Sequence, residues 1–312
     1  MKIVHTFWSC NLATVEELLN HPAGWRESKF HYMSWALSCL LARRHYAEVE
    51  LVTDEVGKEL LVDRLKLPYT SVKVALDGTM TTYPQTLWAL PKLVSYQLQQ
   101  EPFLHIDGDV FLHKPLAPRI TTATLVSQNI EVNFPIYHEA IEAIESHFRY
   151  VPDSIRANRQ TTPQLSASNT GLFGGTNYGF ISTYVREAKH FIDQNKAHWD
   201  KVNSVYFNCV FEQHLLYCLA AQHRLPITYL LNPVDTFDEY GPIARYMGKS
   251  NELGYSHPVG PFKQSPLGCK YVAKGLARVS PDYYRRISKL YPEPASRWWP
   301  IWWSYKQAAA TL

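Results

Sequence analysis

The first hundred residues alternate between strand-like and helix-like segments, and this alternation limits the possible folds more than any other feature. Strand-like runs stand at Lys2–Phe7, Val49–Thr53 and Ser71–Ala75, with helices expected between them near Tyr32–Tyr46 and Val56–Leu65. Such alternation is typical of βαβ units, in which a helix connects parallel strands. We therefore predict an α/β fold with a single Rossmann-like domain, whose mostly parallel central sheet is flanked by helices.

A buried strand then leads directly into two acidic residues. A helix expected from Thr82 to Gln99, with a kink at Pro91, precedes the apolar run Phe103–Ile106, and Asp107-Gly108-Asp109 follows. Ligands of open α/β sheets bind at the carboxyl ends of the strands. Two carboxylates on either side of a glycine can share one hard divalent cation.

The second half of the chain shows a mixed pattern. The expected elements are strands at Thr124–Ser127 and Glu131–Phe134, helices near Ile136–Tyr150, Ile181–Asn195 and Val205–Ala221, and a polar loop at Pro152–Ser168. We interpret this loop as a solvated connection, with a lid or an acceptor-facing segment as the alternative.

Charge and cysteine usage narrow the class of protein. The formal net charge of +3 is small and evenly spread, so nucleic acid is not expected as a partner. The five cysteines form no C-x-x-C pair and no zinc-like spacing, which indicates reduced thiols in a reducing compartment. The N-terminus lacks the pattern of a signal peptide, and no run has the length of a membrane span. We expect a cytoplasmic protein.

A basic motif far downstream is the natural counterpart of the acid pair. It runs from His257 to Lys263 and has the form H-x-x-G-x-x-K, with Gly260 at its centre. Imidazole ligates Mn²⁺ beside carboxylates, glycine lets the backbone approach a phosphate, and lysine supplies compact positive charge. A single histidine among thirteen would be an ordinary residue, but the fixed spacing favours a site that completes a metal shell and neutralises a diphosphate.

Asp107-Gly108-Asp109 admits three interpretations from the residues alone. Two acids after a strand often only make turn and cap hydrogen bonds. The run from Leu104 to Val110 also matches the nucleophile loop of haloacid-dehalogenase-type phosphohydrolases, in which Asp107 would attack phosphorus and Asp109 would act as acid and base. In the third interpretation the acids hold a metal that bridges the phosphates of a nucleotide-sugar. The hydrolase loop normally follows the first strand, whereas about a hundred residues of α/β pattern precede this one.

Four motifs in order give the chain a family resemblance. It resembles the retaining GT-A-fold glycosyltransferases of the glycogenin and bacterial lipopolysaccharide galactosyltransferase type, as a distant branch. That family carries a D-x-D motif, an N-[ST]-G element, a D-Q-x-x-L helix start and a late H-x-x-G-x-x-K. The corresponding residues here are Asp107-Gly108-Asp109, Asn169-Thr170-Gly171, Glu212-Gln213-His214-Leu215-Leu216 and His257 to Lys263.

The resemblance implies a role for each matching residue. Asp107, Asp109 and His257 would ligate Mn²⁺ or Mg²⁺, and Gly260 and Lys263 would contact the diphosphate. The remaining donor contacts would come from Thr6, Lys92, Asp107, Asn169, Thr170 and Gly171, and the catalytic residues would be Gln213 and Glu212. By the same resemblance, residues 1–265 form a GT-A-like catalytic domain, with a nucleotide-binding half at about 1–115 and an acceptor-side half at about 116–265. Residues 266–312 form a basic, aromatic C-terminal extension.

The sequence also departs from the family pattern. Glu212 replaces the usual aspartate, and the usual K-P-W ending becomes Lys263-Gln264-Ser265. The segment His5–Ser9 does not reproduce the usual uridine-binding sequence, so the base of the donor is open. These departures permit a catalytically silent GT-A-like binding module as a further alternative.

The leading expectation is transfer of a hexose from a nucleotide-diphosphate sugar, in particular a UDP-sugar, to a hydroxyl acceptor with retention. A tryptophan-rich stretch, Trp298–Tyr305, follows several basic residues near the C-terminus. Aromatic rings beside basic groups favour the headgroup region of an anionic membrane. The alternatives are packing on the domain or a subunit contact. A peripheral contact at the inner face of a bacterial membrane would suit a glycan or lipid-linked glycan as acceptor.

Overall fold

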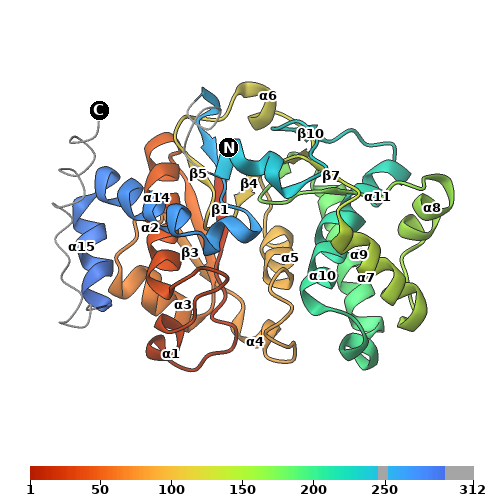
Figure 1. The fold of residues 1–312 in the computed structure, drawn as a ribbon, viewed down its shortest axis with the longest axis horizontal. Helices are drawn as coiled ribbons and strands as arrows, with labels where there is room; N and C mark the ends of the chain where they lie inside the picture. The colour runs from red at the N-terminus through yellow and green to blue at the C-terminus, as the bar shows by residue number, and fades with distance from the viewer. Residues whose placement is uncertain (245–251, 292–312) are drawn as a thin grey trace, which may run out of the picture.

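A seven-stranded sheet forms the centre of the computed structural model, which describes residues 1–244 and 252–291 (Figure 1). The strand order is β10-β6-β9-β4-β1-β2-β3. The strands are β1 (Lys2–Thr6), β2 (Val49–Thr53), β3 (Ser71–Val74), β4 (Phe103–Ile106), β6 (Val126–Ser127), β9 (Leu172–Gly175) and β10 (Thr228–Tyr229). Within this seven-stranded sheet, the two pairs that involve β9 are antiparallel and the other four are parallel. The predicted α/β class with a mostly parallel central sheet flanked by helices is confirmed.

The remaining elements surround this sheet. Two small sheets pair β5 (Phe111–Leu112) with β11 (Tyr255–Ser256) and β7 (Ile130–Val132) with β8 (Ser166–Ser168). The longer helices are α2 (Ser28–His45), α5 (Leu90–Gln97), α7 (Pro135–His147), α8 (Asp153–Thr161), α9 (Tyr178–Gln194), α11 (Leu215–Gln222), α14 (Pro266–Val279) and α15 (Pro281–Leu290). The short helical segments are α1 (Val15–Leu19), α3 (Glu55–Lys58), η1 (Glu59–Arg64), α4 (Asp77–Met80), α6 (Pro118–Thr121), η2 (Lys196–Lys201), α10 (Ser204–Cys209), η3 (Val210–His214), η4 (Phe237–Tyr240), α12 (Gly241–Ala244) and η5 (Gly260–Gln264).

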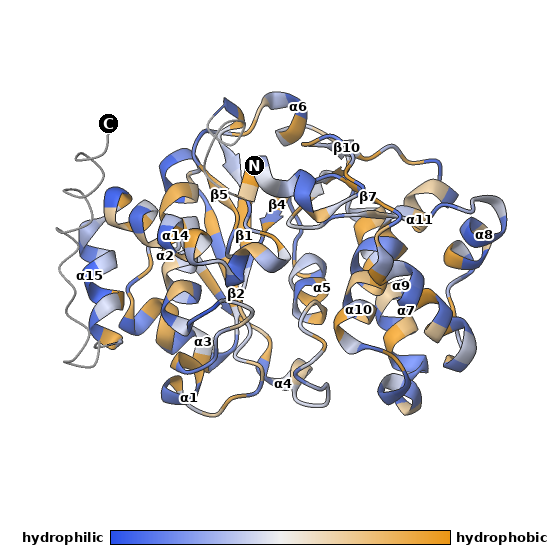
Figure 2. Cartoon of the chain, viewed as in Figure 1, coloured by the Kyte–Doolittle hydropathy of each residue, from blue (hydrophilic) through white to orange (hydrophobic). Residues whose placement is uncertain are grey.

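The core lies on both faces of the central strands. Every residue of β2 and β4 is buried, as expected for central strands covered by helices on both sides. One apolar cluster holds β4 and β9 together with α5, α7 and α9, and a second cluster holds α2, α14 and α15. Hydrophobic residues colour the central strands in Figure 2, whereas α8 and α15 carry many hydrophilic ones. The sheet therefore presents its strand ends, rather than its faces, to ligands.

The two helices after residue 265 pack on the domain. Helix α14 contacts α2 and α15, and α15 also contacts α2. Val272, Leu276 and Ile287 are buried in the cluster that contains Tyr32 and Leu41 of α2. The division at residue 265 stays a prediction, and the segment Trp298–Tyr305 lies outside the described residues.

The predicted helix from Thr82 to Gln99 is wrong in its first half. Helix α5 begins at Leu90, and Pro91 stands in its first turn. Proline lacks an amide hydrogen, but an amide at that position has no partner inside the helix. Pro91 therefore starts the helix instead of kinking it. The preceding turn is attached to Asn208, whose Oδ1 accepts from the Ala89 amide at 2.9 Å and whose Nδ2 donates to the Thr86 carbonyl at 2.7 Å.

The predicted loop at Pro152–Ser168 is also wrong. It contains helix α8 and strand β8, which pairs with β7. Only Ser154 and Ile155 of α8 are buried, so the helix lacks the apolar periodicity that identifies a helix in a sequence. Strand β8 is only three residues long and reads Ser-Ala-Ser. Both elements are stabilised by tertiary contacts that composition does not reveal.

Two further features concern the cysteine side chains and the lengths of the helices. All five cysteines are free, as predicted. Within residues 1–244 and 252–291, no helix combines the length and the apolar character needed to cross a membrane.

Two buried histidines make the stability of the fold sensitive to acid. Burial lowers the pKa of His5 to about 3 and that of His214 to about 4. Because these values lie below the ordinary 6.5, the unfolded chain binds more protons in acid, and stability falls as pH drops from about 6.5 towards 4. The buried carboxyl of Glu212, whose pKa is raised, opposes the trend as a single group. We expect a lower urea midpoint at pH 5 than at pH 7.5, and equal midpoints would contradict this account.

Candidate functional site

The acid pair lies at the carboxyl end of β4, in the middle of the sheet. The Asp107 amide donates to the Gly171 carbonyl at 3.1 Å, and Ser34 Oγ on α2 donates to the Gly108 carbonyl at 2.7 Å. A Cβ added at Gly108 would lie 2.3 Å from the Trp35 ring, so only glycine fits here. These contacts fix the loop that presents the two carboxylates.

Pairing of β5 with β11 brings the two sequence motifs together. Ser256 lies opposite Phe111, so His257 follows beside the acid pair. One ligand atom from each of Asp107, Asp109 and His257 lies within 4.8 Å of the others. His257 Nε2 is 3.4 Å from Asp109 Oδ1, and both side chains are buried. The structure thus brings together all three predicted metal ligands.

The donor atoms of this cluster suit a hard divalent cation. Magnesium and similar ions take oxygen ligands at about 2.1 Å in octahedral geometry, which places neighbouring ligand atoms about 3 Å apart and opposite ones about 4 Å apart. Manganese also accepts imidazole nitrogen beside carboxylates. The 3.4 Å between His257 Nε2 and Asp109 Oδ1 is close to the spacing of neighbouring ligands, and the ligand atoms of all three residues lie within 4.8 Å, so side-chain adjustment would be needed to complete a site.

Lys263 lies against the second acid. Its Nζ is 2.5 Å from Asp109 Oδ2, and η5, which carries it, begins at Gly260 with a φ of +49° in the left-handed region that favours glycine. Burial alone would raise the pKa of Asp109, but the Lys263 ammonium outweighs burial and holds it well below its usual range. Asp109 is therefore a fixed negative charge at neutral pH.

A second buried cation joins Asp107 to Glu212. Lys92 Nζ on α5 is 2.7 Å from Asp107 Oδ1 and 3.1 Å from Glu212 Oε1. Burial opposes the charge on Lys92, yet the two carboxylates raise its pKa above the usual value. Glu212 is fully buried, and this burial raises the pKa of its carboxyl despite the neighbouring lysine. Lys92 therefore connects a predicted metal ligand to a predicted catalytic residue.

Glu212 and Gln213 lie on the π-helical turn η3, between α10 and α11. Single π-helical turns inside α-helices are frequent at functional sites. The Tyr184 hydroxyl donates to the Glu212 carbonyl at 2.6 Å, which fixes this turn. Consecutive side chains reach different partners, because Glu212 faces Lys92 and Gln213 Oε1 lies 3.1 Å from the Tyr137 hydroxyl.

A buried carboxylate that the sequence did not single out holds Asn169. Glu131 Oε1 accepts from Asn169 Nδ2 at 2.9 Å and from the Tyr240 hydroxyl at 2.6 Å. Its Oε2 accepts from the Tyr137 hydroxyl at 2.5 Å, and that hydroxyl also contacts Gln213. Glu131 therefore links two residues that the motifs placed near the sugar. An acid within a strand-like run was the only sequence signal for it.

Gly171 allows the histidine to reach the acid pair. A Cβ at this position would lie 2.4 Å from Cε1 and 2.6 Å from Nδ1 of His257. The preceding residue, Thr170, is buried, and its hydroxyl acts against burial by lowering the pKa of Glu212. The N-T-G element thus contacts both the metal cluster and the Lys92–Glu212 pair.

Thr6 stands apart from these contacts. Its Oγ1 donates to Ser95 Oγ at 2.6 Å and lies 3.0 Å from His105 Nε2. These partners belong to α5 and β4, so the hydroxyl is engaged inside the fold. The structure does not bring the Thr6 hydroxyl to the cluster.

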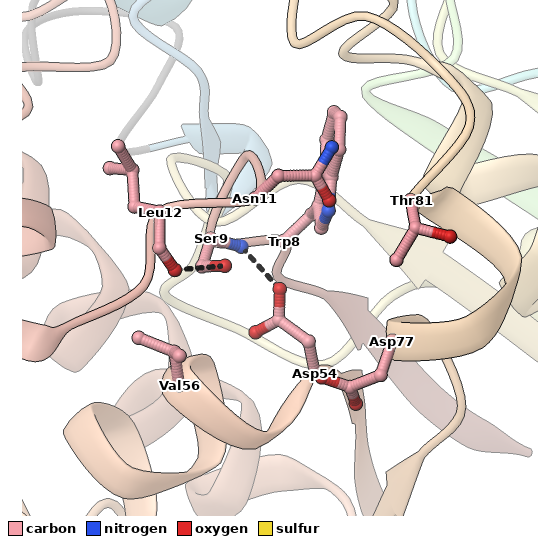
Figure 3. Close-up of a pocket in the computed structure, with 8 residues that line it drawn as sticks. All are labelled: Trp8, Ser9, Asn11, Leu12, Asp54, Val56, Asp77 and Thr81. Carbon is pink, nitrogen blue, oxygen red and sulfur yellow. Dashed lines mark hydrogen bonds between the residues drawn. The ribbon is translucent and has the colours of Figure 1, made fainter.

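A cavity of about 260 Å³ opens at the carboxyl ends of β1 and β2 (Figure 3). Trp8 and Ser9 line it after β1, Asp54 lines it after β2, and Asp77 lines it from α4. The Ser9 amide donates to Asp54 Oδ2 at 2.8 Å, as Figure 3 shows. Because β1 is parallel to both β2 and β4, this cavity and the acid pair share one edge of the sheet. No sequence motif marks the cavity, because its lining residues come from three separate segments.

Comparison with known proteins places the chain in a family without an assigned role. The model of a family of unknown function (DUF6734) matches residues 1–290. No curated protein matches the chain. Among solved structures, the apo form of mouse xyloside xylosyltransferase 1 is similar, with 10% sequence identity and a TM-score of 0.39. That match covers 73% of this chain and 84% of the mouse chain.

Proposed function

We propose that this chain, which belongs to the family of unknown function DUF6734, is a metal-dependent glycosyltransferase. It moves a hexose from a nucleotide-diphosphate sugar, with UDP as the nucleotide, to a hydroxyl acceptor and retains the anomeric configuration. One observation carries the proposal, namely that four motifs far apart in sequence meet around one cluster of charges. The residues that meet there are Asp107 and Asp109, Lys92, Thr170, Gly171, Glu212, His257 and Lys263.

The metal and the diphosphate would lie beside the acid pair. Asp107, Asp109 and His257 would hold Mn²⁺ or Mg²⁺, which when bound neutralises the diphosphate and makes it a better leaving group. Lys263, with a quarter of its side chain exposed, is able to turn from Asp109 to a phosphate oxygen. Stabilising the charge that develops on the leaving group is the largest electrostatic demand of such a transfer.

In this proposal the nucleoside binds in the cavity at the carboxyl ends of β1 and β2. Neighbouring strands lie about 5 Å apart, so the cavity is about one to two strand spacings from the acid pair on β4. Asp54 is buried and accepts from the Ser9 and Gly57 amides. The exposed Asp77, which accepts from the Glu55 amide, keeps lone pairs that suit a ribose hydroxyl or a base N–H, and its charge repels phosphate. A donor bound along this edge would therefore place its base in the cavity and its diphosphate beside Lys263.

The reaction we propose is a same-face displacement. The acceptor oxygen forms a bond to the anomeric carbon while the bond from that carbon to the phosphate oxygen breaks. The proton of the acceptor hydroxyl passes to the departing phosphate oxygen. Glu212 is buried and paired with Lys92, which disfavours it as a covalent nucleophile and leaves it to orient the sugar with Gln213 and Asn169. Trapping a glycosylated Glu212 would overturn this mechanism.

A thermal-shift panel of nucleotide-sugars tests the function. A ligand that binds only the folded protein stabilises it by about 2.7 kcal/mol at 100 times its dissociation constant. We expect one or more UDP-sugars to raise the melting temperature with Mn²⁺ present and not with a chelator. Hydrolysis of an aryl phosphate that is lost in Asp107→Asn and kept in His257→Ala would instead indicate a phosphohydrolase. The absence of any shift across the panel would indicate a silent binding module.

The cellular setting is part of the same proposal. We place the enzyme in the cytoplasm, at the inner face of the membrane, where a glycan or a lipid-linked glycan is its acceptor. The proposed peripheral contact is made through Trp298–Tyr305, outside the described residues.

A further inference from the structure

A buried glutamine lies behind the candidate metal ligand His257. His257 Nδ1 is 2.7 Å from Gln128 Oε1, and the Tyr255 hydroxyl donates to the same oxygen at 2.5 Å. Gln128 has no exposed area, and His257 is 5% exposed. A carboxamide oxygen only accepts hydrogen bonds, so the nitrogen that faces it must carry the proton. The neutral ring is therefore protonated on Nδ1 and bare on Nε2.

The orientation of Gln128 does not depend on His257. Gln128 Nε2 donates to Asn129 Oδ1 at 3.0 Å. Asn129 Nδ2 in turn donates to the Ile130 carbonyl at 3.0 Å, and a backbone carbonyl accepts only. Amide orientations are assigned from such networks, and here a backbone group determines the direction of the whole series. Reversing Gln128 would place its Oε1 against Asn129 Oδ1, and neither of these oxygens can donate a hydrogen bond.

The packing around this pair leaves no room for another partner. A Cβ at Gly171 would lie 2.7 Å from Gln128 Oε1 and 2.4 Å from His257 Cε1. The bare Nε2 points the other way, to a distance of 3.4 Å from Asp109 Oδ1. Two lone-pair atoms at this separation repel each other unless a cation lies between them. Such a spacing is close to that of neighbouring ligands on one divalent ion.

We propose that Gln128, held in place by Asn129, is a positioning residue that locks His257 in the Nδ1–H tautomer and presents its Nε2 to the divalent cation. This inference rests on the metal role proposed above for Asp107, Asp109 and His257. Histidine ligands usually donate their other N–H to a carboxylate or carbonyl, which fixes the ring and the tautomer. In this chain the side-chain carboxamide of Gln128 accepts that hydrogen bond, and the segment around Gln128 carries no recognised motif.

Nitrogen NMR reads the tautomer without any metal. The full chain is labelled with ¹⁵N-histidine and kept metal-free above about pH 8, where an ordinary imidazole is neutral. The His257 signals are identified by their loss in His257→Asn. We expect the proton on Nδ1 in the wild type and its partial or complete transfer to Nε2 in Gln128→Met. A wild-type ring that is protonated on Nε2 would overturn the inference, whatever the protein binds.

Binding of Mn²⁺ alone, measured by calorimetry, tests the consequence. Gln128→Met keeps the length of the side chain but loses the acceptor, and we expect it to weaken binding about 10- to 100-fold. The matched control is Gln99→Met, because Gln99 is a buried glutamine whose amide donates to Glu50 and to the Ser95 carbonyl instead. Melting temperatures show that each variant is folded.

The outcomes separate the inference from the function on which it rests. Wild-type Mn²⁺ affinity in a folded Gln128→Met protein would overturn the positioning role. Equal losses in Gln128→Met and Gln99→Met would overturn it too, because a general packing defect would then explain both. A wild type that shows the Nδ1–H tautomer but binds no Mn²⁺ would overturn the proposed metal site itself.

Discussion

Replacing Asp109 by asparagine is expected to weaken Mn²⁺ binding by more than about 100-fold, a larger loss than is typical for changes to groups behind a metal ligand. The substitution removes a buried negative charge that Lys263 holds ionised. An amide oxygen is a weaker ligand for a hard cation than a carboxylate is. Calorimetric titration with Mn²⁺ measures the change directly.

The control for Asp109→Asn is Asp193→Asn. Asp193 pairs with Lys196 at 3.3 Å and accepts a hydrogen bond from Tyr83, away from the acid pair. We expect its Mn²⁺ affinity to equal that of the wild type. Retained affinity in a folded Asp109→Asn protein would show that this carboxylate is no ligand, and the candidate site would then be a network of ion pairs.

Replacing Lys92 by methionine is expected to destabilise the fold by about 3–5 kcal/mol, the usual effect of removing one partner of a buried ion pair. Lys92 neutralises Asp107 and the fully buried Glu212, so its loss leaves an uncompensated charge in the core. The double variant Lys92→Met with Glu212→Gln removes that charge as well. It should recover a large part of the stability, as measured by urea unfolding.

The surface lysine Lys58 provides the matched comparison. It pairs with Asp63 at 3.0 Å where both side chains are well exposed, and such pairs contribute little to stability. Lys58→Met should therefore leave the urea midpoint unchanged within error. If Lys92→Met proved as mild as Lys58→Met, Lys92 would not be the cation that holds the two carboxylates in the core.

Periodicity and strand patterns in the sequence were sufficient to predict the central strands of the sheet. Strands Val49–Thr53 and Phe103–Ile106 occur where they were predicted, because short runs in which apolar and β-branched residues dominate suit the middle of a covered sheet. Elements stabilised mainly by tertiary contacts were missed. Helix α8 buries two side chains and β8 is a three-residue strand, so neither has a pattern strong enough to detect.

The candidate site could be predicted only as far as its motifs extend. Spacing identified Asp107, Asp109 and His257, and the structure brings their ligand atoms together. Motif spacing could not identify Gln128 or Glu131, because the roles of these residues depend on which hydrogen-bond partners folding places beside them. A buried polar side chain becomes recognisable only when its neighbours are known.

The central claim is that this cluster holds a metal for a nucleoside diphosphate. Titration of UDP into the wild-type protein by calorimetry, with Mn²⁺ and then with a chelator, tests it most directly. The account predicts saturable binding that requires Mn²⁺ and is lost in Asp109→Asn. Binding of UDP that is equally tight with and without the metal, or no binding under either condition, would contradict it.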